Sequence, residues 1–369
     1  MSTQVMTKRR GALRRTVRVL DTALAPHGLD RYVELAWPTW STTEIRARVV
    51  AAKRPTADCV TLTLRPNGNW DGFVAGQHTQ LTVEIDGVRY TRCYSMANAA
   101  PGSGRAGALI ELTVKAHPEG LVSRYLVDNA APGMVVGLSP AQGDFTLPDP
   151  RPSRILLISG GSGITPVMSM LRTLCAEGHP GAVTFVHYAL TAEDHPYREE
   201  VERLAAAHQN VRVVNVYTDA PGTGDLDGFF NPTQLQEAEP EWDQTEAFVC
   251  GPAPLMDAVR SHFAEAGLAS RYHDEAFVLA PLEARPTGAV IELASSDLRL
   301  VDAGGSILEQ AEANGLRPAH GCRMGICHSC TRPMTSGAVR DLVTGEVIDR
   351  PGDIRICVSA PASDVTIDL

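Results

Sequence analysis

The spacing of four cysteines constrains this chain more than any other feature. Cys322, Cys327 and Cys330 follow a C-x4-C-x2-C pattern, and Cys357 follows at a distance. This is the ligand spacing of plant-type [2Fe-2S] clusters, which are held by four thiolates. Structural zinc is the alternative, but it usually takes its thiolates in C-x2-C pairs, which fits this pattern poorly. We therefore predict a [2Fe-2S] cluster bound by these four cysteines.

The composition is that of a globular protein with more than one domain. A chain of 369 residues exceeds one ordinary core, which predicts two or three domains. No apolar run is long enough for a transmembrane helix. The net charge of −10 argues against nucleic acid as the main partner, because phosphate binding requires a basic surface. The other four cysteines are scattered through apolar segments, so we expect no disulfide framework and a reducing, cytoplasmic location.

The first 42 residues form a predicted basic arm. Lys8, Arg9, Arg10 and three further arginines lie within the first twenty residues, which contain no acid. The arginines interrupt any apolar run, so this is not a convincing signal peptide. Two interpretations stay open: a solvated tail, or an arm attracted to an anionic membrane surface.

Residues 43–150 are predicted to form a small antiparallel β-barrel. Apolar and polar residues alternate between 44 and 64, which is the period of half-buried strands. Further short strands, separated by glycine and proline, are expected at 80–85, 89–95, 109–115 and 135–139.

Two short motifs in this region are suited to a nucleotide-like cofactor. Arg92-Cys93-Tyr94-Ser95 places a cation, a flat ring and a hydroxyl near the end of a strand, where they could hold a phosphate, a ribityl chain and an isoalloxazine edge. Gly120-Leu121-Val122-Ser123 opens a short helical pattern, and a helix start suits a pyrophosphate. Either motif alone also fits an ordinary strand end or helix cap, so their order and spacing carry the argument.

Residues 151–282 are predicted to be an α/β domain with a parallel sheet. Strands expected at 154–159, 183–189, 211–217 and 247–250 alternate with helical patterns, including 197–208 and 253–266. Ligands of such sheets bind at the carboxyl ends of the strands. Cys250-Gly251-Pro252 lies at such an end, although a buried cysteine before a turn is equally compatible with it.

The loop GGSGITP at 160–166 follows the first of these strands. Its glycines allow the backbone to approach a diphosphate closely. Thr165 is placed to cap the next helix and Pro166 to occupy its first position. A proline stands where the third glycine of GxGxxG would be, so this is not the Rossmann fingerprint.

Residues 283–369 are predicted to form a small α+β module around the cysteines. Strand-like VIEL and LRLVD precede a helical pattern at 306–314, and short strands follow the cysteine loop, ending with 365–367. This cysteine pattern and order of elements resemble a plant-type ferredoxin domain, which implies a ferredoxin-like (β-grasp) fold.

Together these motifs resemble those of the ferredoxin reductase-like flavoproteins, in the branch with a C-terminal plant-type ferredoxin domain. RCYS at 92–95 resembles the family's RxYS flavin motif, and GLVS at 120–123 its FAD pyrophosphate motif. GGSGITP resembles its nicotinamide-nucleotide loop, and Cys250-Gly251-Pro252 its CGP motif. Asp274 to Phe277 resembles the ExF segment that lies over the flavin. GLVS points to FAD, whereas relatives resembling phthalate dioxygenase reductase use FMN.

The resemblance implies an NAD(P)H-dependent oxidoreductase with FAD and a [2Fe-2S] cluster. It places Ser95 near flavin N5, Arg92 and Tyr94 on the flavin phosphate and ribityl chain, and Cys250 and Glu275 in the hydride-transfer pocket. The other cofactor-binding residues that it implies are Gly120, Val122, Ser123, Gly160, Gly161, Gly163, Thr165, Pro166, Gly251, Pro252 and Phe277. A nicotinamide gives up two electrons as a hydride and a cluster accepts one, so a flavin must stand between them.

The electron acceptor is a separate protein on this interpretation. The arm, WSTTEIRARVV and TRCYSMANA are most similar to actinobacterial reductases that serve membrane acyl-CoA desaturases, which implies a desaturase partner, membrane contact and a slight preference for NADPH. Two alternatives stay open. One is the reductase component of a Rieske-type oxygenase, and the other is a redox sensor without turnover.

Overall fold

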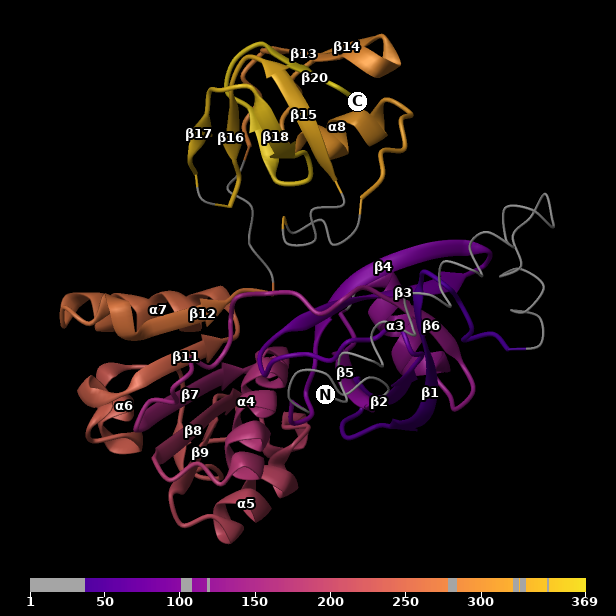
Figure 1. Ribbon diagram of the computed structural model, residues 1–369. Helices are drawn as coiled ribbons and strands as arrows, with labels where there is room; N and C mark the ends of the chain where they lie inside the picture. The colour runs from indigo at the N-terminus through magenta and orange to yellow at the C-terminus, as the bar shows by residue number, and fades with distance from the viewer. Residues whose placement is uncertain are drawn as a thin grey trace, which may run out of the picture. The chain divides into compact units, whose positions relative to one another are not determined.

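The computed structural model describes residues 37–100, 108–117, 120–277, 284–320, 325, 330–343 and 345–369 (Figure 1). The predicted basic arm lies outside the described residues up to residue 36. The chain divides into two compact units, and the first contains the antiparallel sheet together with residues 168–178. The second contains the parallel sheet and the C-terminal module. Among the described residues, no helix is long and apolar enough to cross a membrane.

The first unit is built on a six-stranded sheet in the order β4-β3-β6-β1-β2-β5. In β1, the core-facing residues Ile45, Ala47 and Val49 alternate with more exposed arginines, as the sequence pattern predicts. Met96, just after β4, bridges Leu112 of β5, so the two edge strands meet and close the barrel. The strands are β1 (Ile45–Lys53), β2 (Cys59–Pro66), β3 (His78–Ile85), β4 (Val88–Ser95), β5 (Ile110–Lys115) and β6 (Val135–Leu138).

Two helices complete this unit. Helix α3 (Leu121–Asn129) buries Val122 and Leu126 and packs against β5 and β2. Helix α4 (Ile164–Glu177) holds the segment after β4 through its C-terminal half. Arg172 Nη1 donates to the carbonyl of Ala97 at 2.7 Å and to Glu111 Oε1 at 2.6 Å. This segment is therefore fixed by a charged side chain that is itself largely buried.

The second sheet is parallel, in the order β10-β9-β8-β7-β11-β12. Helices α6 and α7 lie on one side of it and α5 on the other (Figure 1). Apolar side chains of α6 and α7, including Leu235 and Phe263, pack on the sheet. The strands are β7 (Arg154–Gly160), β8 (Ala182–Ala189), β9 (Val211–Tyr217), β10 (Leu226–Asp227), β11 (Glu246–Cys250) and β12 (Tyr272–Glu275), and the helices are α5 (Arg198–Ala207), α6 (Pro232–Ala238) and α7 (Ala253–Glu265).

The start of α4 differs from the sequence prediction. A 3-10 turn, η1 (Gly161–Gly163), leads directly into the helix, whose first residue is Ile164. Thr165 and Pro166 therefore lie inside the first helical turn, and the prediction of a Thr165 cap and a Pro166 first position is wrong. Proline is tolerated there because the amides of a first turn have no intrahelical partner.

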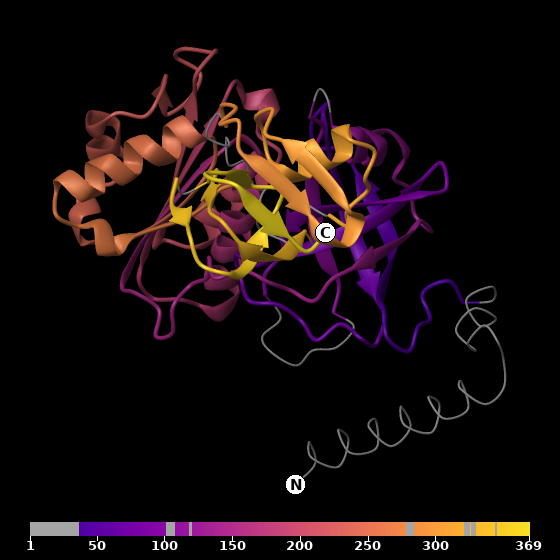
Figure 2. The ribbon, with the colours of Figure 1, turned by 90° about the horizontal axis from the view of Figure 1, so that it is seen from above.

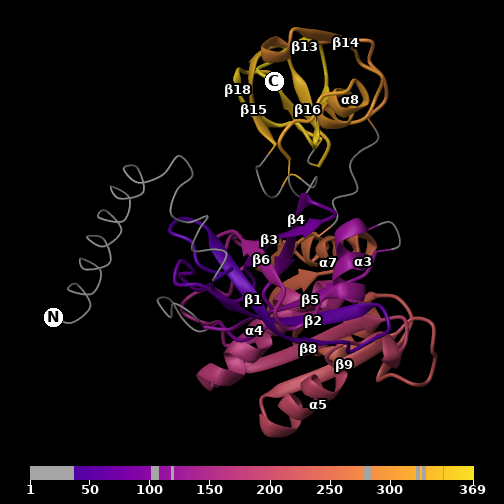
Figure 3. The same ribbon diagram turned by 90° about the vertical axis from the view of Figure 1, so that its right-hand side faces the viewer.

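The C-terminal module has a five-stranded sheet in the order β14-β13-β20-β15-β18 and a three-stranded sheet in the order β17-β16-β19. Helix α8 (Ile307–Ala313) lies against the larger sheet (Figures 1 and 3), and Figure 2 shows the module in orange to yellow from above. Ser306 and Glu309 form a capping box at its start. The strands are β13 (Val290–Leu293), β14 (Leu298–Val301), β15 (Thr331–Ser336), β16 (Val339–Asp341), β17 (Val347–Ile348), β18 (Gly352–Arg355), β19 (Ser359–Pro361) and β20 (Val365–Ile367).

The buried carboxylate of Asp302 connects several segments in the first part of this module through hydrogen bonds. Its side chain accepts hydrogen bonds from the amide and hydroxyl of Thr287, the amide of Gly304 and Nε2 of Gln310. Burial alone raises the pKa of Asp302, but these hydrogen bonds outweigh it, so the net pKa lies below the ordinary value. The ionised carboxylate thus stabilises the folded module.

We expect Asp302→Ala to destabilise the module by about 3 kcal/mol, because donors in a buried loop lose a charged acceptor. Thermal unfolding at pH 7 measures this, with Asp353→Ala, an exposed acid on β18, as the control. A depressed folded-state pKa contributes stability that is lost as the pH falls through it, so the difference from wild type should shrink below about pH 4. A difference that is constant with pH would contradict the electrostatic explanation.

Candidate functional site

Two of the four predicted cluster ligands lie among the described residues. Cys330 precedes β15 and Cys357 follows β18, and both are buried. Their Sγ atoms are 3.1 Å apart, and the amide of Ile356 donates to the carbonyl of Cys330 at 3.4 Å. Two buried sulfurs converging on one point fit a shared metal centre. Cys322 and Cys327 lie outside the described residues.

The predicted nucleotide loop contacts the predicted CGP motif through the backbone. A Cβ on Gly163 would lie 2.2 Å from the carbonyl oxygen of Cys250, and one on Gly251 would lie 2.9 Å from the amide nitrogen of Gly160. A Cβ on Gly160 would meet Pro252 at 2.8 Å. Only glycine allows the two loops to approach this closely. Both loops leave the carboxyl edge of the parallel sheet, the place where such sheets bind ligands.

Gly161 is the open position of this loop. Its φ is +52°, and a Cβ there would meet nothing within 4 Å. The hydroxyl of Thr165, in the first turn of α4, donates to the carbonyl of Ser162 at 3.2 Å and so stabilises the loop. The loop therefore presents partly exposed backbone at the start of a helix of 14 residues, an arrangement suited to a diphosphate.

Cys250 and Glu275, predicted from different motifs, are brought together. They are directly opposite each other on the adjacent parallel strands β11 and β12. Burial raises the pKa of the Cys250 thiol well above its ordinary value, and the negative charges of Glu275 and Asp274 raise it further. Cys250 is therefore a neutral thiol. Glu275 and Phe277 are half-buried.

A buried polar group beside Cys250 was not predicted from the sequence. Ser159 pairs in register with Cys250 on one side and with His187 on the other. Its hydroxyl lies 2.8 Å from Nδ1 of His187, whose ring is 4.2 Å from that of His195. Burial, together with the nearby positive charge of Arg198, lowers the pKa of His195 to about 4, so the ring is neutral at pH 7. The only sequence signal was a histidine within an otherwise apolar strand.

The predicted flavin residues lie at the end of β4. Ser95 is buried, whereas Arg92 and Tyr94 are half-buried. Arg92 Nη1 donates to the neighbouring carbonyl of Thr91 at 2.8 Å. A buried hydroxyl beside a partly exposed cation and ring fits the polar edge and phosphate of a flavin.

GLVS lies at the start of α3, as predicted. Gly120 is the N-cap residue, and no side chain among the described residues caps this end. The hydroxyl of Ser123 accepts from the amide of His117 at 3.1 Å and donates to the carbonyl of Gly120 at 3.3 Å. Val122 is buried. The helix start thus has first-turn amides for a pyrophosphate, with Ser123 shaping the loop before it.

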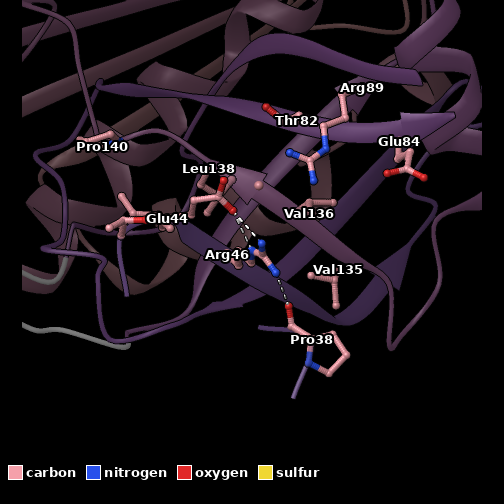
Figure 4. Close-up of a pocket in the computed structure, with 13 residues that line it drawn as sticks. Pro38, Glu44, Arg46, Thr82, Glu84, Arg89, Val135, Val136, Leu138 and Pro140 are labelled. Atoms are coloured by element: carbon pink, nitrogen blue, oxygen red, sulfur yellow. Dashed lines mark hydrogen bonds and ion pairs between the residues drawn. The ribbon is translucent and has the colours of Figure 1, made fainter. Parts of the chain in front are cut away.

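A separate hollow of about 480 Å³ opens on the barrel (Figure 4). Arg46 lies within it and donates to Glu44 Oε2 through two nitrogens, at 2.9 and 2.8 Å, and to the carbonyl of Pro38 at 3.3 Å. Arg89 and Glu84 also line it. None of the predicted site residues lines this hollow.

Three family models match the chain in sequence order. They are the oxidoreductase FAD-binding domain over residues 47–147, the oxidoreductase NAD-binding domain over 157–261 and the 2Fe-2S iron-sulfur cluster binding domain over 291–362. An NADPH oxidoreductase of Mycobacterium tuberculosis is 36% identical over 97% of this chain and 92% of that protein. The chain belongs to the ferredoxin reductase-like iron-sulfur flavoproteins.

Other relatives of this flavoprotein serve oxygenases. The glycine betaine monooxygenase reductase subunit of Pseudomonas aeruginosa is 31% identical over 80% of this chain and 87% of that protein. Among solved structures, phthalate dioxygenase reductase has the same fold, with a TM-score of 0.60 and 24% identity over 89% of this chain and 98% of that one.

The flavoprotein is an NAD(P)H-dependent iron-sulfur reductase. When bound, FAD accepts a hydride and delivers its electrons singly. The partly exposed backbone at Gly161 suits the nucleotide diphosphate, and the start of α3 suits the FAD pyrophosphate. The Cys250 thiol is neutral and lies opposite Glu275 on the neighbouring strand. These individual roles stay predictions.

We expect Gly161→Asn to raise the KM for the nicotinamide nucleotide about tenfold or more. Asparagine tolerates a positive φ, and the open space admits its side chain, which would then occupy the diphosphate position. Gly178→Asn is the matched control, because Gly178 has a φ of +65° and equally open surroundings after the other end of α4. An equal KM in both variants would remove this loop from the nucleotide site.

Proposed function

We propose that the protein transfers electrons from NADPH through FAD and the [2Fe-2S] cluster to a separate protein, with a membrane fatty-acyl desaturase as the acceptor. One observation carries the electron path: the adjacent buried cysteines Cys330 and Cys357 belong to the same chain as the nucleotide loop at Gly163 and the flavin-type strand β4. A hydride carrier and a one-electron centre in one chain require a flavin between them.

The desaturase proposal rests on the N-terminal arm. Similarity to the mycobacterial NADPH oxidoreductase extends over 97% of the chain and so includes much of this arm, whereas similarity to the glycine betaine monooxygenase reductase subunit covers 80%. The arm has six basic residues among its first twenty. Such a segment gains about 1 kcal/mol for each basic residue near an anionic membrane.

A Rieske-type oxygenase is the second candidate acceptor. The relatives that are reductase subunits of glycine betaine monooxygenase and stachydrine N-demethylase favour it. The desaturase candidate is embedded in a membrane and the oxygenase candidate is not. A test of membrane binding by the basic arm therefore distinguishes them.

NADPH is the proposed donor. The name of the mycobacterial relative supports it. Arg198, the first residue of α5, supplies an exposed cation after β8 and pairs with Glu202 at 3.1 Å. The segment directly after β8 contains no arginine that could bind the 2'-phosphate of NADPH. Arg198 is therefore the proposed partner of this phosphate.

We expect Cys327→Ser to remove the cluster and leave FAD bound, because the cysteines and the flavin motifs belong to separate family domains, residues 291–362 and 47–147. The variant should reduce ferricyanide with NADPH at nearly the wild-type rate and lose at least 90% of cytochrome c reduction, as an order-of-magnitude estimate. Cys175→Ser on α4 is the control. Loss of FAD in Cys327→Ser would contradict independent cofactor binding, and a wild-type protein without steady turnover would favour a redox sensor.

Deleting residues 1–20 tests the membrane acceptor. We expect unchanged cytochrome c reduction, weaker salt-sensitive cosedimentation with vesicles containing phosphatidylserine, and slower turnover with a membrane-embedded desaturase. A charge-neutralised arm, with its six basic residues replaced by glutamine, is the matched control for length. Equal cosedimentation of the full-length and truncated proteins at low salt would leave the Rieske-type oxygenase as the better candidate.

A further inference from the structure

One arginine connects the three chain segments that carry the cluster cysteines. Arg355 is two residues before Cys357, and in the β15–β18 pairing it lies opposite Thr331, the neighbour of Cys330. Its Nη1 donates at 2.7 Å to the carbonyl of Gly325, which lies in the sequence between Cys322 and Cys327.

A buried carboxylate holds the same guanidinium from the other side. Arg355 Nη2 donates to Asp341 Oδ2 at 2.6 Å, and the Asp341 side chain is only 6% exposed. The other carboxylate oxygen, Oδ1, accepts from the amide of Val343 at 2.8 Å. Asp341 therefore fixes the direction of the guanidinium, whose two terminal nitrogens serve two different partners.

Gly325 lies close to the residue that follows Cys357. It is buried with a φ of +74°, and a Cβ there would lie 2.8 Å from Cγ2 of Val358, the residue after Cys357. The backbone turn that contains Cys357 is also fixed, because the carbonyl of Arg355 accepts hydrogen bonds from the amide of Val358 and the hydroxyl of Ser359, each at 3.0 Å. Arg355 thus contacts the loop with its side chain and shapes the Cys357 turn with its backbone.

We propose that Arg355, oriented by Asp341, is a positioning residue for the [2Fe-2S] cluster. It binds Gly325 beside the Cys357 turn and places a positive charge next to Gly325 and Cys357. A cation there favours the reduced cluster, which carries one more negative charge. The inference rests on the assignment of the four cysteines as ligands.

Substitutions at Arg355 and Asp341 in the intact flavoprotein distinguish the effect of contact geometry on the cluster from the effect of charge. Arg355→Lys keeps the charge but cannot reproduce the two-pronged contact. Arg355→Gln removes the charge. Asp341→Asn keeps an acceptor for the guanidinium and removes the negative charge. Arg340→Gln, on an exposed neighbouring position of β16, is the control with the same change in net charge as Arg355→Gln.

We expect Arg355→Lys to lose its cluster to a chelator about tenfold faster than wild type, as is typical when a residue supporting metal ligands is replaced. Loss is followed by the electron paramagnetic resonance signal of the reduced cluster, with bound FAD as the internal reference. The midpoint potential should fall in Arg355→Gln and rise in Asp341→Asn, and Arg340→Gln should match wild type.

Opposite shifts in potential are the decisive result, because simple loosening of the fold would move both variants in one direction. Chelation rates and potentials equal to wild type in Arg355→Lys, Arg355→Gln and Asp341→Asn would overturn the inference. That result would leave the electron path intact, because Cys327→Ser tests the ligands themselves.

Discussion

The contact between Gly163 and the carbonyl of Cys250 is the steric constraint on which the nucleotide end of the parallel sheet depends. Strands β7 and β11 are neighbours in register, so the loops that leave their carboxyl ends must share one space. A Cβ 2.2 Å from a carbonyl oxygen is impossible, and the loops therefore meet backbone to backbone. The approach of the two loops lies between Cys250, which is completely buried, and the start of α4 at Ile164.

Much of the architecture could be predicted because its signals are local. Strands β9 and β20 occur at the predicted residues, and the helical pattern at 306–314 appears as α8 with Ser306 and Asn314 as its caps. Thr165 failed as a cap because the η1 turn extends the helix backwards, which depends on tertiary contact rather than on residue type. The Ser159–His187 contact could not be predicted either, because it exists only through the register of two parallel strands.

Buried acids show the same limit in the C-terminal module. Asp302, Asp341 and Asp353 look alike in the sequence, yet the first two are buried and the third is exposed. The difference arises from donors that fold around the first two: loop amides and a glutamine for Asp302, and Arg355 with a loop amide for Asp341. Burial of a charge is tolerated only with such partners. The cysteine spacing predicted a cluster, but the residues that support its ligands became visible only in three dimensions.

Strand β20 is the last strand of its module in the chain, yet it lies in the middle of the five-stranded sheet, parallel to β13 and antiparallel to β15. The sheet therefore cannot close until the chain has been synthesised as far as Ile367. The barrel and the parallel sheet have no such dependence and can fold while the ribosome is still translating the module. All four cysteines precede β20 in the chain, so a polypeptide that ended before β20 would carry the cluster ligands without the central strand of the module's larger sheet.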